Sequence, residues 1–312
     1  MKKISVVICV FNEEPNIRPL SEQIMDALQN IDFEAIFVDD GSTDKTKQEI
    51  LKIKDPRFLL VELKRNYGQS SALQAGIDVA EGEFIVLLDG DLQNDPADIP
   101  MMLTMAEEND WDMVAGVRSN RKDGMFLRKI PSKMANYMIR QSTGIKMKDL
   151  GCTLKVFKND AIKNIHIYGE LHRFIPVLIS LEGATRITQV DVNHRPRQFG
   201  KSKYSLSRTT RVMSDLLLML FFKKYLQRPM HFFGMLGILT FGIGMVINIY
   251  LLILKILGHD LWGKPLLLLG ILLVVAGIQF ITTGILAELQ MRTYFESQHK
   301  TPYQIRQVVK TA

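Results

Sequence analysis

Two carboxylates stand one residue apart directly after a strongly apolar run. The run Phe84–Leu88 is followed by Asp89, Gly90 and Asp91, and the amide of Gln93 lies two positions further on. Carboxylate and amide oxygens are hard ligands that suit Mg²⁺ or Mn²⁺, and such cations usually complete an octahedral shell with substrate phosphates. An Asp-Gly-Asp sequence also forms surface turns. Taken alone, the segment fits either a metal site made by Asp89, Asp91 and Gln93 or a surface turn.

Polar residues also follow two other apolar runs, residues 3–11 and 35–38, and these are Asn12, Glu13, Asp39 and Asp40. Helix-like segments come next, over residues 17–28 and 42–53, with Ser42 or Thr43 as the predicted N-cap of the second. The alternation of strands and helices predicts an α/β fold with a mainly parallel sheet. Ligands bind at the carboxyl ends of parallel strands, so we predict one site at that edge.

The kind of nucleotide site can be narrowed from the motifs. The chain contains neither Gly-x-Gly-x-x-Gly after its first strand nor a phosphate-binding loop of the type Gly-x-x-x-x-Gly-Lys-[Ser/Thr]. A nucleotide would then be held by acids and a metal ion. Asp39 or Asp40 could accept hydrogen bonds from a base or ribose, while Asp91 reaches the pyrophosphate through the cation. This pattern favours a nucleotide-sugar donor.

Four motifs together resemble those of a known family, and they are Cys9–Glu13, Val38–Ser42, Asp89–Gln93 and Arg197–Tyr204. They are similar to the motif series of inverting family 2 glycosyltransferases with a GT-A fold, and more narrowly to the polyprenyl-phosphate glycosyltransferases. Residues 65–69 and 149–152 resemble the bacterial branch that transfers formamido-arabinose to undecaprenyl phosphate. This branch favours a UDP-sugar donor, such as UDP-glucose or a UDP-linked modified arabinose, over a GDP-sugar. The resemblance implies that the donor is bound by Asn12, Glu13, Asp39, Asp40, Gly68, Asp89, Arg197 and Lys203.

Two long charge-free runs, Phe232–Leu254 and Pro265–Ala287, each exceed the ~20 residues that cross a bilayer. We expect a catalytic GT-A domain over residues 1–204, an interfacial amphipathic helix region over 205–230, transmembrane helices over 231–255 and 264–288, and a tail over 289–312. Lysine and arginine flank the spans on their outer sides more than between them. By the positive-inside rule, the catalytic domain and both termini lie in the cytoplasm, at the inner membrane. A buried helix of the soluble domain remains the alternative for the interfacial region.

A lipid acceptor also requires a phosphate site. Arg118 ends another predicted strand at the active edge, and Arg128 and Ser132 are spaced to share one helix face. Dolichyl-phosphate mannose synthases carry a similar Arg-x-x-x-Ser, so the resemblance implies that these three residues hold the acceptor phosphate. A solvated basic face is the alternative. The net charge of +6 suits anionic substrates at a membrane surface, whereas no nucleic-acid reader motif is present.

The nucleophile sets the expected chemistry. A phosphate monoester has its second pKa near ~6, so the lipid phosphate is already largely anionic and needs little help from a base. We therefore expect Asp91, through its metal, and Arg118 to act in catalysis by stabilising charge. The resemblance implies Asp149 as the base or as a positioning residue. In relatives, a loop such as residues 194–204 closes over the donor.

Two other functions fit the sequence less well. A processive polysaccharide synthase would carry a Gln-x-x-Arg-Trp motif, which neither Trp111 nor Trp262 completes. A non-catalytic membrane scaffold of the same fold would not need the acidic and basic motif residues that are present. The favoured product is a polyprenyl-phospho-sugar for modification of cell-envelope glycans such as lipopolysaccharide. Expected partners are further copies of the chain, as in a tetramer, and a downstream flippase or glycosyltransferase.

Overall fold

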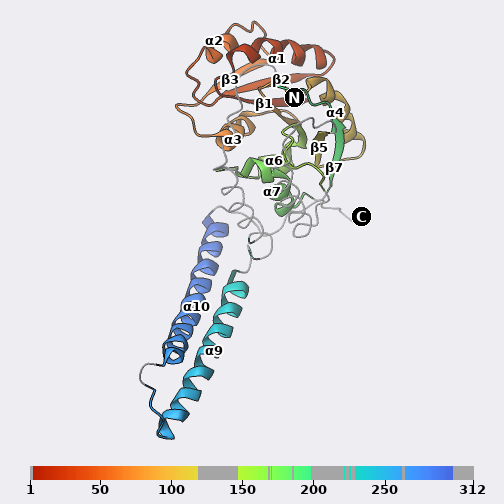
Figure 1. Ribbon diagram of the computed structural model, residues 1–312. Coiled ribbons are helices and arrows are strands. Elements are labelled where there is room, and N and C mark those ends of the chain that lie inside the picture. The colour runs from red at the N-terminus through yellow and green to blue at the C-terminus, as the bar shows by residue number, and fades with distance from the viewer. Residues whose placement is uncertain are drawn as a thin grey trace, which may run out of the picture. The chain divides into compact units, whose positions relative to one another are not determined.

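The computed structural model describes residues 3–118, 147–167, 169, 171–184, 186–197, 221, 225, 229–261 and 264–297. The chain forms two compact units, residues 1–219 and 220–312 (Figure 1). The predicted site residues Arg128, Ser132 and Lys203 lie outside the described residues, as does most of the predicted interfacial region 205–230.

Within the described part of the first unit, a 7-stranded sheet has the order β3-β2-β1-β4-β6-β5-β7. The strands are β1 (Ile4–Val10), β2 (Phe33–Asp39), β3 (Phe58–Glu62), β4 (Phe84–Asp89), β5 (Met113–Arg118), β6 (Lys155–Lys158) and β7 (Ile187–Val192). Only β6 runs antiparallel to its neighbours, β4 and β5, among these strand pairs. The α/β fold with a mainly parallel sheet is therefore confirmed.

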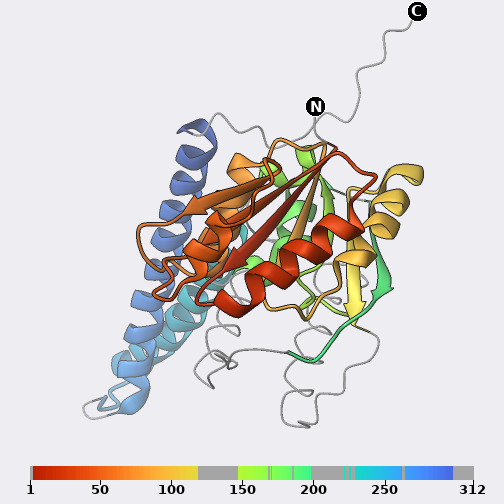
Figure 2. The same cartoon turned by 90° about the horizontal axis from the view of Figure 1, so that it is seen from above.

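Helices cover both faces of this sheet, as the apolar runs on both sides of its central strands require. They are α1 (Glu14–Ala27), α2 (Thr46–Leu51), α3 (Gln69–Val79), α4 (Ile99–Glu108), α6 (Asn159–Lys163) and α7 (Ile175–Leu181), with 3₁₀ turns η1 (Pro96–Asp98) and η2 (Leu171–Phe174). The even-numbered residues of β1 share one core with α1 and α4. On the other face, α3 packs so closely on β1 and β2 that a Cβ at Gly76 would meet Val7 and Val38. Figure 2 shows α1 lying across the strands.

The predicted cap of the second helix is wrong. The helix α2 begins at Thr46, after Lys45, and the side chain of Asp44 accepts from the backbone N–H of Thr46 at 3.0 Å. The hydroxyl of Ser42 instead accepts a hydrogen bond from the backbone N–H of Asn12 at 2.9 Å. Thr43 donates its backbone N–H to the side chain of Asn12. A residue with a strong preference for caps is used here to join two loops at the sheet edge.

The second unit contains two long apolar helices, α9 (Pro229–Ile256) and α10 (Pro265–Ser297). Both are long and apolar enough to cross a membrane, with mean hydropathies of 2.2 and 2.4, and only 17 % and 11 % of the residues in their most apolar stretches are buried. The helices pack on each other through small residues: a Cβ at Gly277 would lie 2.5 Å from the backbone nitrogen of Phe241. These are the candidate spans that the sequence predicts. The second helix continues past the predicted boundary at 288 to Ser297.

Candidate active site

The strands that carry the predicted site residues end at one edge of the sheet. In the parallel register, Cys9 lies opposite both Val38 and Asp89, and Val10 lies opposite Asp39. Because β6 is antiparallel to both β4 and β5, β5 points the same way as β4 and brings Arg118 to this edge. The structure thus brings together the polar residues that follow β1, β2, β4 and β5.

The two carboxylates at the end of β2, Asp39 and Asp40, are buried and accept hydrogen bonds from backbone N–H groups. Asp39 accepts from the N–H of Ser42 at 2.9 Å. Asp40 accepts from Tyr67 at 2.7 Å and from Gly68 at 2.9 Å. Gly68 has φ 94, a conformation that L side chains rarely adopt, so a glycine is needed at this point of the loop. Asp40 and Gly68 therefore fix the loop at residues 67–68 beside the end of β2, and their contact with a donor stays a prediction.

The residues after β1 connect three parts of the chain. Asn12 has φ 53, and its backbone N–H meets the hydroxyl of Ser42. Glu13 is 8 % exposed and accepts from the amide of Asn16 at 2.5 Å. Its other carboxylate oxygen forms an ion pair with Arg197. The structure thus pairs two of the predicted donor-binding residues, Glu13 and Arg197, with each other.

The two carboxylates at the end of β4, Asp89 and Asp91, differ in the number of hydrogen bonds that they accept from the protein. Asp89 accepts from the amide of Gln69 at 3.0 Å through one oxygen and from the hydroxyl of Thr153 at 2.6 Å through the other. Asp91 accepts only from the backbone N–H of Gln93, at 3.2 Å, among the described residues. Burial, and secondly the charge of Asp91, raise the pKa of Asp89 to about 6. Asp91 is the carboxylate whose oxygens are the more available.

This arrangement fits a divalent cation. A positive charge between Asp89 and Asp91 would offset the repulsion that Asp91 exerts on the Asp89 carboxylate. No group of three or more His, Cys, Asp or Glu side chains in the described ranges could hold a metal ion. A cation at Asp91 and Asp89 would need oxygens from a substrate to complete its shell, as Mg²⁺ sites often do. The side-chain amide of Gln93 lies near the carbonyl of Arg195, at 3.5 Å.

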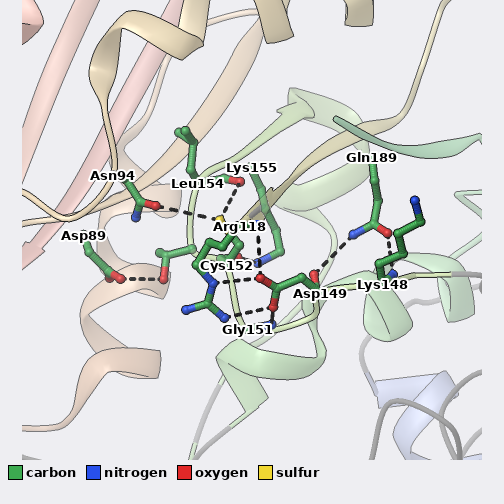
Figure 3. Close-up of polar contacts among 11 residues, drawn as sticks. Asp89, Asn94, Arg118, Lys148, Asp149, Gly151, Cys152, Leu154, Lys155 and Gln189 are labelled. Atoms are coloured by element: carbon green, nitrogen blue, oxygen red, sulfur yellow. Dashed lines mark hydrogen bonds and ion pairs between the residues drawn. The ribbon is translucent and has the colours of Figure 1, made fainter. Parts of the chain in front are cut away.

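Arg118 and Asp149 form a two-pronged ion pair beside these carboxylates (Figure 3). The Nε and Nη2 atoms of Arg118 donate to the two oxygens of Asp149 at 2.7 and 2.9 Å. Each side chain is 14 % exposed. The backbone N–H of Gly151 adds a further bond to Asp149 at 3.0 Å. Since both carboxylate oxygens accept from the protein, the geometry suits orientation of the guanidinium better than removal of a proton.

Sequence reasoning missed Thr153 and Lys155, which follow the motif at residues 149–152. Lys155 is 3 % exposed, its amine donates to the carbonyl of Cys152, and burial lowers its pKa. A lysine between the apolar residues Leu154 and Val156 is the signal that could have drawn attention to this segment. Cys152 is 1 % exposed, its thiol lies 3.8 Å from Asn94 Oδ1, and burial raises its pKa. The thiol of Cys152 is therefore packed inside the protein.

The segment after β7 crosses the loop that follows β4. Asn193 donates to Asp98 through its backbone N–H at 2.7 Å. Arg195 donates its backbone N–H to the carbonyl of Gln93 at 2.8 Å and pairs with Asp95 through its guanidinium. Together with Arg197, these contacts fix residues 193–197 along the edge that carries Asp91.

Comparisons with known proteins agree with this architecture. Residues 5–165 match the sequence model of Glycosyl transferase family 2. The chain is 46 % identical to the dodecaprenyl-phosphate galacturonate synthase of Rhizobium johnstonii, over 98 % of this chain and 93 % of that protein. It is 35 % identical to the undecaprenyl-phosphate 4-deoxy-4-formamido-L-arabinose transferase of Proteus mirabilis, over 99 % of this chain and 94 % of that protein. Both relatives belong by name to the polyprenyl-phosphate group that the motifs resemble.

A solved structure supports the fold. Glucosyl-3-phosphoglycerate synthase from Mycobacterium tuberculosis, in complex with Mn²⁺, UDP and phosphoglyceric acid, superposes with a TM-score of 0.56. The match covers 71 % of this chain and 78 % of that one at 16 % identity. At this identity the likeness concerns the fold alone. The matched family model and the two relatives show that the chain belongs to glycosyl transferase family 2 and is a glycosyltransferase of the polyprenyl-phosphate group.

Proposed function

We propose that this protein transfers a sugar, with inversion, from a UDP-sugar to a polyprenyl phosphate such as undecaprenyl phosphate, and that the sugar is a uronic acid, galacturonate. The observation that carries the proposal is 46 % identity, over 98 % of the chain, to a dodecaprenyl-phosphate galacturonate synthase. The modified arabinose of the second relative, at 35 % identity, is the next donor to consider. The strand-end residues described above supply the chemistry that such a transfer needs.

The donor site is expected to include a divalent metal ion, Mg²⁺ or Mn²⁺. Asp91 would be its main protein ligand, with Asp89 beside it, because Asp91 is the less engaged of the two carboxylates. When bound, the cation would supply Lewis-acid stabilisation of the departing diphosphate. Support comes from the adjacent carboxylates and from the Mn²⁺ and UDP held in the solved structure of the same fold. Asn12, Glu13, Asp39, Asp40, Gly68, Arg197 and Lys203 remain the proposed surroundings of the donor.

The protein's main work in the reaction is to bring two polyanions together. One oxygen of the lipid phosphate attacks the anomeric carbon while the bond to UDP breaks, and a single displacement inverts that centre. The phosphate is already anionic near neutral pH, so no residue must remove a proton first. Arg118, held by Asp149 at the end of β5, would offset phosphate charge at a fixed position. The acceptor roles of Arg128 and Ser132 rest on resemblance.

The two apolar helices and the distribution of basic residues support placement at the inner membrane. Each helix is long enough to cross a bilayer. Basic residues lie before the first and after the second charge-free run, which favours a cytoplasmic catalytic unit and cytoplasmic termini. The lipid acceptor would then meet the enzyme on the cytoplasmic leaflet, where nucleotide sugars are available. The domain boundaries 1–204, 205–230, 231–255, 264–288 and 289–312 are part of this proposal.

The proposal can be tested with the full chain in membranes or detergent. The protein is incubated with polyprenyl phosphate and a panel of radiolabelled donors, UDP-galacturonate, UDP-formamido-arabinose, UDP-glucose and a GDP-sugar, and the lipids are then extracted. We expect label in the lipid fraction from UDP-galacturonate and none from the GDP-sugar. An exposed control, Thr104→Val, should behave like the wild type. Label from UDP-formamido-arabinose alone would refute the uronate assignment, and label from no donor would refute the function.

A further inference from the structure

Asp89 is held from two sides by residues that the proposed chemistry does not use. Gln69, the first residue of α3, donates to one carboxylate oxygen at 3.0 Å. Thr153, just before β6, donates to the other at 2.6 Å. The two donors come from parts of the chain far apart in sequence, and both bonds are to a charged acceptor. Such bonds are shorter and stronger than neutral ones, so they fix the rotamer of Asp89.

The backbone around Thr153 is anchored on both sides of that residue. Before it, the carbonyl of Cys152 accepts from the buried amine of Lys155. After it, the carbonyl of Leu154 accepts from the backbone N–H of Gly116 in β5 at 3.0 Å. Cys152 and Leu154 are 1 % and 0 % exposed. Thr153 itself is half-buried. Its hydroxyl is therefore held in place by packing.

We propose that Thr153 is a positioning residue for the donor site: its hydroxyl, together with the amide of Gln69, holds Asp89 in the orientation that receives the diphosphate and its cation. The inference rests on the proposed function and adds residues to it. Since Asp89 and Asp91 flank a single glycine, freedom at Asp89 disturbs the spacing of the pair. Thr153 contacts neither substrate in this role. It acts through Asp89.

The test uses binding as well as turnover. The full chain in detergent is titrated with UDP in the presence of Mn²⁺ by calorimetry, in the wild type, Thr153→Val, Thr153→Ser and Thr104→Val. Valine keeps the shape of threonine and removes the hydroxyl, whereas serine keeps the hydroxyl. Thr104 lies on the exposed face of α4 and donates only to its own helix, so it is the matched control. We expect Thr153→Val to weaken UDP binding roughly tenfold to a hundredfold, the range for losing one bond to a charged group.

The conservative and control variants decide what the loss means. Thr153→Ser and Thr104→Val should bind UDP as the wild type does. In steady-state assays, Thr153→Val should raise the KM for the UDP-sugar and leave the KM for the polyprenyl phosphate unchanged. A purely structural role would lower the melting temperature and alter both constants together.

Several outcomes would overturn the proposal. The first is wild-type UDP affinity in Thr153→Val. The second is a fall in UDP affinity in Thr153→Ser as large as that in Thr153→Val. The third is a lower melting temperature together with changes in the KM of both substrates. Should Thr153→Val not fold, Gln69→Met removes the other donor to Asp89, and unchanged UDP affinity there has the same meaning. Failure of the wild type to bind UDP with Mn²⁺ would instead refute the proposed function, and with it the role of Asp89.

Discussion

The ion pair between Arg118 and Asp149 offers a way to separate a positioning carboxylate from a catalytic base. Asp149→Asn keeps the size of the side chain, removes its charge and replaces one acceptor oxygen by an amide that cannot accept from the guanidinium. If Asp149 acts through Arg118, Asp149→Asn lowers kcat/KM only when Arg118 is present. If Asp149 removes a proton from the acceptor, Asp149→Asn lowers kcat/KM by the same factor with or without Arg118.

The size of the effect follows from the geometry. Two charge-assisted bonds of 2.7 and 2.9 Å link side chains that are each 14 % exposed, so the pair is neither a surface contact nor fully buried. Removing one such bond costs about 1.5–3 kcal/mol, which is roughly a tenfold to 150-fold fall in kcat/KM. Loss of a general base costs about 10²–10⁴ in rate. The two ranges overlap, so the single variant cannot decide the question.

A double-mutant cycle decides it. The variants Asp149→Asn, Arg118→Ala and the double variant are assayed for transfer of radiolabelled sugar to polyprenyl phosphate, and kcat/KM is compared. We expect Asp149→Asn to cost less than about threefold once Arg118 is already alanine. A double variant whose loss equals the product of the two single losses would refute the positioning role. Glu62→Gln, which breaks the surface pair with Lys47, is the control and should leave kcat/KM unchanged.

Three further outcomes are expected. Asp91→Ala should abolish transfer while the melting temperature stays close to that of the wild type, and excess EDTA should abolish wild-type transfer; full activity in either case contradicts the metal site. A reporter fused after Ala312 should report the cytoplasm and one inserted at His259 the opposite side; the same side for both means that the helices do not each cross. Gly68→Ala should lower the free energy of unfolding by about 1–3 kcal/mol in denaturant titrations, because its φ is 94 and its ψ is 160; unchanged stability contradicts the strain argument.

The sheet and its active edge could be predicted because they depend on local sequence. Apolar runs such as residues 84–88 define buried parallel strands, and the acids that directly follow them must then meet at one edge. The candidate spans are equally local, since length and absence of charge suffice to recognise them. These features required no knowledge of contacts between distant residues.

The partners of the site residues could not be predicted in the same way. Thr153 reaches Asp89 across 64 positions because β6 inserts antiparallel between β4 and β5, and no pattern in the sequence indicates that insertion. The pairing of Glu13 with Arg197 spans 184 positions and depends on the path of the chain after β7. Ser42 has the chemistry of a helix cap, yet a tertiary contact with Asn12 takes its hydroxyl. Local preference is outweighed where distant loops meet.

The structure also orders the acids of the edge by how much of their hydrogen-bonding capacity the protein uses. Asp40 and Asp89 each accept two hydrogen bonds from protein donors, which hold their side chains in one orientation. Asp91 accepts one long bond from a backbone N–H among the described residues. Asp91 is also partly exposed, so its remaining oxygen lone pairs are open to a cation. Asp91 accepts fewer protein hydrogen bonds than Asp40 and Asp89, so it has the most capacity left to bind a substrate or its cation.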